Sequence, residues 1–252
     1  MIEVKNLSKN YGGTLALDDV SFTVGKPEIV GFLGPNGAGK TTAMKIITTY
    51  LAPTAGTVAI DGVDVAKDPL AVRRKIGYLP ERAPLYEEMV VSDYVRFVGE
   101  ARGLSGDALV RRADWVVGAT GLGTVLRKKI NMLSKGYRQR VGLAQAMIHD
   151  PEILILDEPT TGLDPLQIVG IRNLIRELAR EKTILFSSHV LSEITSVSER
   201  VIVIHRGRKV ADGKFETLKR QVVKRDDASL EDIFIALCGE KKETLTLGGG
   251  EQ

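Results

Sequence analysis

A glycine-rich loop near the N-terminus carries residue types that can bind phosphate. It comprises Gly34, Pro35, Asn36, Gly37, Ala38, Gly39, Lys40 and Thr41. Its glycines let successive backbone N–H groups converge on one anion, and a helix expected over 42–50, beginning with Thr42, adds its N-terminal dipole. Lys40 supplies positive charge for β- and γ-phosphates, and the Thr41 hydroxyl can hold Mg²⁺. The loop and Thr42 therefore predict a binding site for a nucleoside triphosphate.

Two adjacent carboxylates follow an apolar run in the second half of the chain. Residues 153–156 show no polar alternation, which predicts a strand buried on both faces of a parallel sheet. Asp157 and Glu158 then lie at its carboxyl end, the edge where ligands bind in open α/β sheets. We expect Asp157 to hold Mg²⁺ through water and Glu158 to polarise the water that attacks the γ-phosphate. A solvated turn is the alternative for an isolated Asp-Glu pair, but the upstream phosphate loop favours the catalytic interpretation.

A third segment, Leu-Ser-Lys-Gly-Tyr at 133–137, precedes a helical pattern that continues to 149. With the two motifs above, it resembles the signature of ATP-binding subunits of ABC (ATP-binding cassette) transporters, and the resemblance covers nearly all of 1–238. Ser134 can cap the helix, and Gly136 allows a close approach to phosphate. The resemblance implies that this helix points at the γ-phosphate held by a second subunit. A plain helix cap is the alternative role of Ser134.

Three further residues match the same family. Tyr11 resembles the aromatic residue that stacks on adenine, although an ordinary tyrosine at a strand end is the alternative. Asp164, in Thr-Gly-Leu-Asp at 161–164, resembles the polar residue of a loop that reaches the partner's site. His189 follows a predicted buried strand and resembles the switch residue that bonds the γ-phosphate. The resemblance therefore implies three catalytic residues, Lys40, Glu158 and His189.

The chain also departs from the usual family pattern. Glu81 stands after an expected strand where the family usually carries glutamine. Its carboxylate can still ligate Mg²⁺, beside Thr41 and Asp157, but it adds negative charge near the triphosphate. Lys135 and Tyr137 replace the usual glycine and glutamine of the signature. The Pro-Glu…Pro-Leu-Tyr segment at 80–86, together with Leu-Ser-Lys-Gly-Tyr at 133–137, resembles ATPase subunits of bacterial exporter-type ABC systems, those grouped with multidrug, sodium-efflux and gliding-motility transporters.

The resemblance and the periodicity together predict an α/β fold, a P-loop NTPase core of the ABC ATPase type with a parallel sheet. Short β-patterned pieces over 1–27 and 56–66 indicate an antiparallel strip beside this core. Helical patterns cover 69–76, 92–102 and 107–119. We expect a single ATP-binding domain over 1–238, with a helical subdomain inserted over about 82–150. The last stretch, 239–252, lacks an apolar period and is expected to be a flexible tail.

Composition and the resemblance constrain location and partners. The chain has 252 residues, 35 basic against 32 acidic, a balance that does not itself indicate nucleic acid. No apolar stretch approaches the roughly 20 residues that cross a bilayer, so we expect a separate polytopic permease to provide the membrane path. The second expected partner is another ABC ATPase chain, identical or not. The expected location is peripheral, at the cytoplasmic face of the cell membrane.

Some alternatives stay open from the sequence. A soluble ABC ATPase acting on nucleic acid or ribosomes would usually carry a long coiled coil or a second cassette, and neither is evident here. An importer ATPase is a second alternative within the transporter class. Pro84, Leu85, Tyr86 and Tyr94 could form the surface that docks on the permease, or could equally be buried within the helical subdomain.

Overall fold

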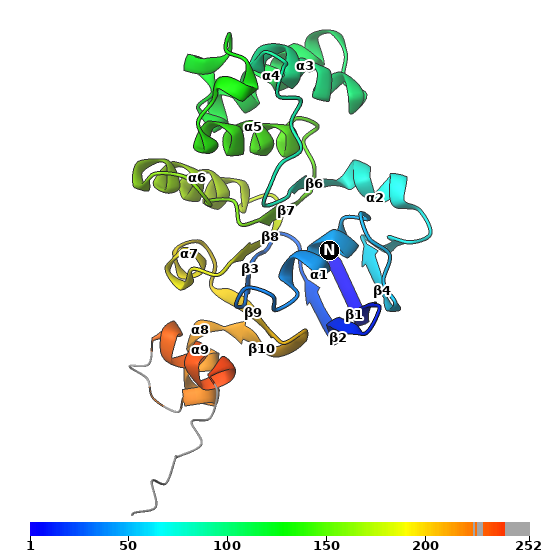
Figure 1. The fold of residues 1–252 in the computed structure, drawn as a ribbon, viewed down its shortest axis with the longest axis vertical. Coiled ribbons are helices and arrows are strands. Elements are labelled where there is room, and N and C mark those ends of the chain that lie inside the picture. Colours follow the sequence, from blue (N-terminus) through cyan, green and yellow to red (C-terminus); the bar gives the residue numbers. More distant parts are fainter. Residues whose placement is uncertain (224, 226–228, 240–252) are drawn as a thin grey trace, which may run out of the picture.

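The computed structural model describes residues 1–223, 225 and 229–239, and its centre is a six-stranded sheet (Figure 1). The sheet has the order β10-β9-β3-β8-β7-β6, and all neighbouring strands are parallel except β10, which is antiparallel to β9. Its strands are β3 (Ile29–Leu33), β6 (Ile76–Leu79), β7 (Ile153–Asp157), β8 (Thr183–Ser188), β9 (Arg200–His205) and β10 (Arg208–Lys214). The predicted parallel sheet is therefore confirmed.

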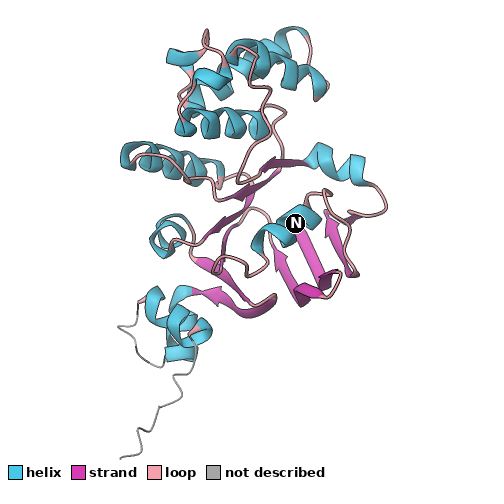
Figure 2. Cartoon of the chain, viewed as in Figure 1, coloured by secondary structure: helices cyan, strands magenta, loops and turns pink. Residues whose placement is uncertain are grey.

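Both faces of the sheet are covered, which explains the continuous apolar runs of its strands (Figure 2). Ile153 and Ile155 of β7 share a core with α1 (Lys40–Ile47) on one face. Leu154 and Leu156 share a core with α6 (Pro165–Leu178) and α7 (Leu191–Val197) on the other. Successive side chains of a strand point to opposite faces, so β7 can remain apolar at every position only when it is covered on both sides.

A second, antiparallel sheet lies on the α1 side of the molecule (Figure 1). Its order is β2-β1-β4-β5, and its strands are β1 (Ile2–Tyr11), β2 (Thr14–Val24), β4 (Ala55–Ile60) and β5 (Val63–Asp64). Alternate residues, such as Ile2 and Val4, face the shared core. The predicted antiparallel strip is therefore confirmed.

Helices dominate the segment between β6 and β7, at the end of the molecule opposite β10 (Figure 1). Here lie α3 (Val91–Ala101), α4 (Gly106–Thr120), α5 (Lys135–Met147) and the short 3₁₀ turns Gly123–Val125 and Ile130–Met132. Helix α2 (Pro69–Lys75) precedes β6. In α3 the buried side chains include Val91, Tyr94, Val95 and Val98, an i, i+3, i+4, i+7 stripe that packs toward α4 and α5. We call α3 to α5 and their connections the helical lobe.

The chain continues beyond β10 with α8 (Phe215–Leu218), a π-helical turn over Lys219–Val223, and α9 (Leu230–Cys238). Of the predicted flexible tail, only Gly239 lies within the described residues. Among the helices described, none is both long enough and apolar enough for a bilayer crossing.

Candidate nucleotide site

The glycine-rich loop joins β3 to α1, and its glycines are fixed by close packing. A Cβ at Gly34 would fall 2.3 Å from the Ile204 carbonyl oxygen, and one at Gly39 would fall 2.5 Å from that of Ala16. Gly39 also has φ of 107° and precedes the first residue of α1 without any side-chain cap. The N-terminal N–H groups of α1 are thus left uncapped by side chains, an arrangement that suits an anion.

A cleft of about 330 Å³ lies against this loop. Its walls include Ala16, the loop from Asn36 to Thr42, Glu81 and Glu158. The Lys40 ammonium donates to the carbonyl oxygens of Gly34 (2.7 Å) and Pro35 (3.3 Å) and lies 3.9 Å from Glu158 Oε1. Burial lowers the pKa of Lys40, and the Glu158 carboxylate opposes this shift. Lys40 is therefore a buried cation held by carbonyl oxygens at the floor of the phosphate loop.

Glu158 directly follows β7 and is buried in a left-handed backbone conformation, with φ of 51°. Its N–H donates to Ser187 Oγ at 3.0 Å, and both its carboxylate oxygens lie 3.0 Å from His189 Nδ1. Burial raises the pKa of Glu158, while the hydrogen bond to His189 opposes that shift. A carboxylate with a raised pKa, next to a cleft, is suited to accept a proton.

Asp157 ends β7 and is completely buried. Its Oδ1 accepts a 2.6 Å hydrogen bond from Ser187 Oγ, whereas Oδ2 is buried without a hydrogen-bond partner in the protein. Burial raises the pKa of Asp157, and the Ser187 hydroxyl opposes this. The orphaned oxygen is a position that a water molecule or a cation would satisfy.

The three expected metal ligands lie at or beside the phosphate cleft. Thr41 and Glu81 line the phosphate cleft, and Asp157 lies beneath it with its free oxygen. Among the described residues, no three His, Cys, Asp or Glu side chains gather into a cluster that could hold a metal ion alone. This oxygen-donor set fits Mg²⁺, which usually keeps several waters and takes few protein ligands beside substrate phosphates.

The residues expected to reach a partner's nucleotide, Ser134, Gly136 and Asp164, lie outside the phosphate cleft. Ser134 caps α5 by accepting from the Tyr137 N–H (3.4 Å), and Asp164 caps α6 by accepting from the Gln167 N–H (2.9 Å). Gly136 lies in the first turn of α5. Within the described part of the chain, none of Ser134, Gly136 and Asp164 is among the residues that line this cleft. Their expected contact with phosphate would thus require a second chain.

Tyr11 is the last residue of β1, and its side chain is 48% exposed. The Lys9 ammonium lies 5.3 Å from the centroid of its ring. Tyr11 does not line the phosphate cleft. Its stacking on adenine stays a prediction.

Sequence reasoning missed two residues that hold the site together. Ser187 bonds both Asp157 and Glu158, and Gln139 of α5 donates through Nε2 to the Glu158 carbonyl oxygen at 3.4 Å. The only sequence signal for Ser187 is its place near the carboxyl end of a predicted buried strand. Nothing in the local pattern distinguishes Gln139 from the other polar residues of its helix.

The proposed permease-docking residues divide between surface and core. Pro84 and Tyr86 are exposed, Leu85 is half-buried, and Tyr94 is buried. The Tyr86 ring packs edge-on against Tyr94 (6.1 Å between centroids) and lies 5.4 Å from Phe97. Tyr94 therefore supports the aromatic surface from below.

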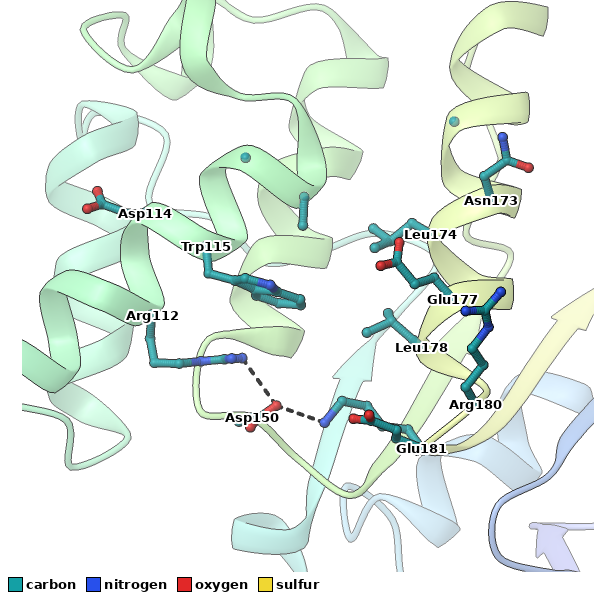
Figure 3. A pocket seen from close by; sticks show the side chains of 14 residues that line it. Arg112, Asp114, Trp115, Asp150, Asn173, Leu174, Glu177, Leu178, Arg180 and Glu181 are labelled. Carbon is teal, nitrogen blue, oxygen red and sulfur yellow. Dashed lines mark hydrogen bonds and ion pairs between the residues drawn. The ribbon is translucent and has the colours of Figure 1, made fainter.

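A separate cleft of about 840 Å³ lies between α4 and α6 (Figure 3). The Arg112 guanidinium lies 4.5 Å from the Trp115 ring centroid and 3.4 Å from Asp150, which also accepts from Lys182 at 2.8 Å. Arg112 further donates to the carbonyl oxygens of Met147 and Ile148 at the end of α5. None of the predicted site residues lines this cleft. Its ion pairs join Arg112 and Lys182 to Asp150, in the connection between α5 and β7.

Comparison with known proteins places these features in a family. The model of the family described as ABC transporter matches residues 17–161. The ABC transporter ATP-binding protein NatA of Bacillus subtilis (strain 168) is 40% identical over 205 residues, which cover 81% of this chain and 83% of NatA. The bacitracin transport ATP-binding protein BcrA of Bacillus licheniformis is 36% identical over 234 residues, 92% of this chain and 76% of BcrA.

Solved structures agree with the sequence matches. An ATP-binding subunit of an ABC transporter superposes with a TM-score of 0.87 at 34% identity, over 94% of this chain and 99% of that one. A dimeric ATP-binding cassette in a post-hydrolysis state with ADP and Pi gives a TM-score of 0.80 at 28% identity, over 85% and 98%. The chain belongs to the ABC transporter family, as an ATP-binding subunit that hydrolyses ATP.

Proposed function

We propose that this ATPase powers an exporter through a separate membrane permease, and that ATP drives its pairing with a second ATPase chain. One observation carries the proposal: the phosphate cleft holds Lys40 and Glu158, while Ser134 and Gly136 lie outside it. A site divided in this way needs a partner that presents the signature helix. The dimeric form of the solved cassette with ADP and Pi supports pairing of such chains.

The residues of the cleft have distinct roles in hydrolysis. The triphosphate binds the N–H groups of the loop and of the α1 N-terminus, with Thr42 in the first turn, and draws the Lys40 ammonium from the Gly34 carbonyl toward phosphate. The attacking water forms a bond to the γ-phosphorus as the bond to the bridging oxygen of ADP breaks. Glu158 orients this water and takes its proton, which its raised pKa favours. His189, which is hydrogen-bonded to Glu158, can donate a hydrogen bond to the γ-phosphate, so its position depends on whether that phosphate is present.

Mg²⁺ would be held by the Thr41 hydroxyl, the free oxygen of Asp157 and the Glu81 carboxylate. When bound, this ion neutralises charge on the β- and γ-phosphate oxygens. Ser187 fixes the other Asp157 oxygen, so only one oxygen of that carboxylate is available. Tyr11 would stack on adenine.

The second chain completes the site. Its Ser134, Gly136 and the N-terminus of its α5 would face the γ-phosphate held by the first chain, and its Asp164 would reach across from the start of α6. Because each ATP contacts both chains, nucleotide stabilises the pair by mass action. The same chain or a related ATPase could fill this role.

The permease is expected to dock on the exposed aromatic surface formed by Tyr86 and Phe97, beside Pro84. In this proposal the chain is peripheral, at the cytoplasmic face of the membrane. The relatives named for bacitracin transport and as NatA support a transporter of the exporter branch over an importer. They also argue against a soluble ATPase, and no nucleic-acid partner is expected.

Nucleotide-dependent pairing tests the proposal directly. Glu158→Gln keeps side-chain size but removes the base, so ATP stays unhydrolysed. Size-exclusion chromatography of this variant should show a monomer without nucleotide and a dimer with ATP and Mg²⁺. Ser134→Arg should prevent the dimer while the monomer still binds ATP. Loss of ATP binding by monomeric Ser134→Arg would contradict the division of the site between two chains.

A further inference from the structure

One face of α5 lies along the loop that follows Glu158. At the first position of the helix, the Lys135 side chain covers Gly162, where an added Cβ would fall 2.5 Å from Lys135 Cδ. At the next position, a Cβ on Gly136 would fall 3.2 Å from Leu163 Cδ2. The start of the signature helix is thus packed against the loop between β7 and α6 of its own chain.

A third contact joins the same helix face to Glu158 itself. Gln139 lies one helical turn after Lys135, on the same side of α5, and is only 7% exposed. Its Nε2 donates to the Glu158 carbonyl oxygen at 3.4 Å. Because the three contacts lie on one rigid element, a displacement of α5 acts on the whole segment from Glu158 to Leu163.

The backbone of Glu158 is held on both sides of its α-carbon. Ser187 Oγ accepts its N–H, and Gln139 donates to its C=O. A left-handed conformation is unfavourable for a residue with a side chain and persists only where its surroundings impose it. Ser187 belongs to the sheet, whereas Gln139 belongs to the helical lobe. The direction of the Glu158 carboxylate therefore depends on the position of the lobe.

We propose that Gln139 is a positioning residue that couples the signature helix to Glu158 of the same chain. The inference rests on the proposed two-chain site, in which the N-terminus of α5 faces the nucleotide held by the partner. The contact is already present in the single chain, so a shift of α5 when Ser134 engages that nucleotide is passed through Gln139 to the Glu158 backbone. Engagement of the partner's ATP by a signature helix then adjusts the base of the same chain for hydrolysis.

This role concerns turnover rather than nucleotide affinity. Gln139 does not line the phosphate cleft, so its loss leaves the groups that bind ATP in place. Coupling of this kind also makes the two sites of a dimer interdependent. Removal of the Gln139 donor should therefore lower kcat and weaken the cooperativity of hydrolysis with respect to ATP.

Two variants of the full chain remove the donor in different ways. Gln139→Met keeps the approximate volume, and Gln139→Glu keeps the shape. We expect both to lower kcat roughly tenfold, with KM for ATP within about twofold of the wild type and a smaller Hill coefficient. The matched control is Gln145→Met, on the same helix. This substitution removes a hydrogen bond between Tyr94 and Gln145 and leaves the contact of Gln139 with Glu158 in place. Its kcat should stay close to that of the wild type.

A wild-type kcat in folded Gln139→Met or Gln139→Glu overturns the inference. So does a fall in kcat that is matched by Gln145→Met, or one accompanied by an equal loss of ATP binding. Should Gln139→Met fail to fold, Gln139→Glu decides the result.

A dimerisation assay separates this inference from the proposed function. In the Glu158→Gln background, addition of Gln139→Met should leave the ATP-dependent dimer intact, since Gln139 acts after pairing. Loss of that dimer would assign Gln139 to assembly and overturn the coupling. A Glu158→Gln chain that stays monomeric with ATP would instead contradict self-pairing in the proposed function, whatever the Gln139 variants do.

Discussion

The Lys40 ammonium lies 3.9 Å from the Glu158 carboxylate, yet its hydrogen bonds go to the loop carbonyl of Gly34 and, more weakly, of Pro35. These carbonyl oxygens offer a neutral set of acceptors to a cation whose pKa burial has already lowered. A phosphate oxygen carries negative charge and is a stronger acceptor. Nucleotide therefore competes for Lys40 against the loop itself, and the loop keeps the ammonium close to its working position before nucleotide arrives.

Lys40→Ala should abolish measurable ATP hydrolysis, because the γ-phosphate loses its nearest cation. Turnover assays measure this effect. Near-normal turnover would contradict the placement of the nucleotide site at this loop.

Glu158→Gln should raise the unfolding free energy of the nucleotide-free chain at neutral pH. Burial raises the pKa of Glu158 in the fold, so the native chain binds its proton more tightly than the unfolded chain does. The unfavourable contribution of Glu158 therefore grows as pH rises from the unfolded value, about 4.3, through the raised folded value. Glutamine has no such dependence. The stability gain of the variant should shrink toward zero as pH falls below that window, and urea unfolding across pH tests this. A stability gain that persists at acid pH would show that the gain comes from packing and not from the titration of Glu158.

Much of the core followed from its sequence, because local pattern and tertiary role agree there. The apolar run of β7 predicted a buried strand, and the expected helix after the phosphate loop is present, although it begins at Lys40 rather than at 42. Glycine supplies the left-handed residue at position 39, from which the helix can start directly.

Residues whose role depends on contacts between different elements could not be predicted in this way. Ser187 meets Asp157 because β7 and β8 align these two positions as neighbours, a register that no local pattern encodes. The contact of Gln139 with Glu158 needs the docking of the helical lobe on the core. Likewise, the helical phase of α3 decides that Tyr94 is buried, while Tyr86 precedes the helix and is exposed.

Arg112→Met should weaken the contacts between the helical lobe and the segment that leads from α5 into β7. The guanidinium satisfies carbonyl oxygens of Met147 and Ile148 at the end of α5 and pairs with Asp150 (Figure 3). We expect a loss of about 1–3 kcal/mol in unfolding free energy. Arg111→Met is the matched control on the same helix, since Arg111 is exposed and should change stability by less than about 0.5 kcal/mol. Equal effects of the two substitutions would remove the structural role assigned to Arg112.

Phe97→Glu should weaken association with the permease while it leaves hydrolysis by the isolated chain unchanged. Phe97 is 41% exposed and extends the aromatic surface of Tyr86, so a charge there disrupts an apolar contact without entering the nucleotide cleft. Trp115→Glu provides a control of the same exposure, 40%, on α4 beside the other cleft. Co-purification of the chain with its membrane subunit from mild detergent should fall for Phe97→Glu and persist for Trp115→Glu. The reverse pattern would place the docking surface at the cleft between α4 and α6, and equal retention by both variants would exclude the aromatic surface as the site of contact.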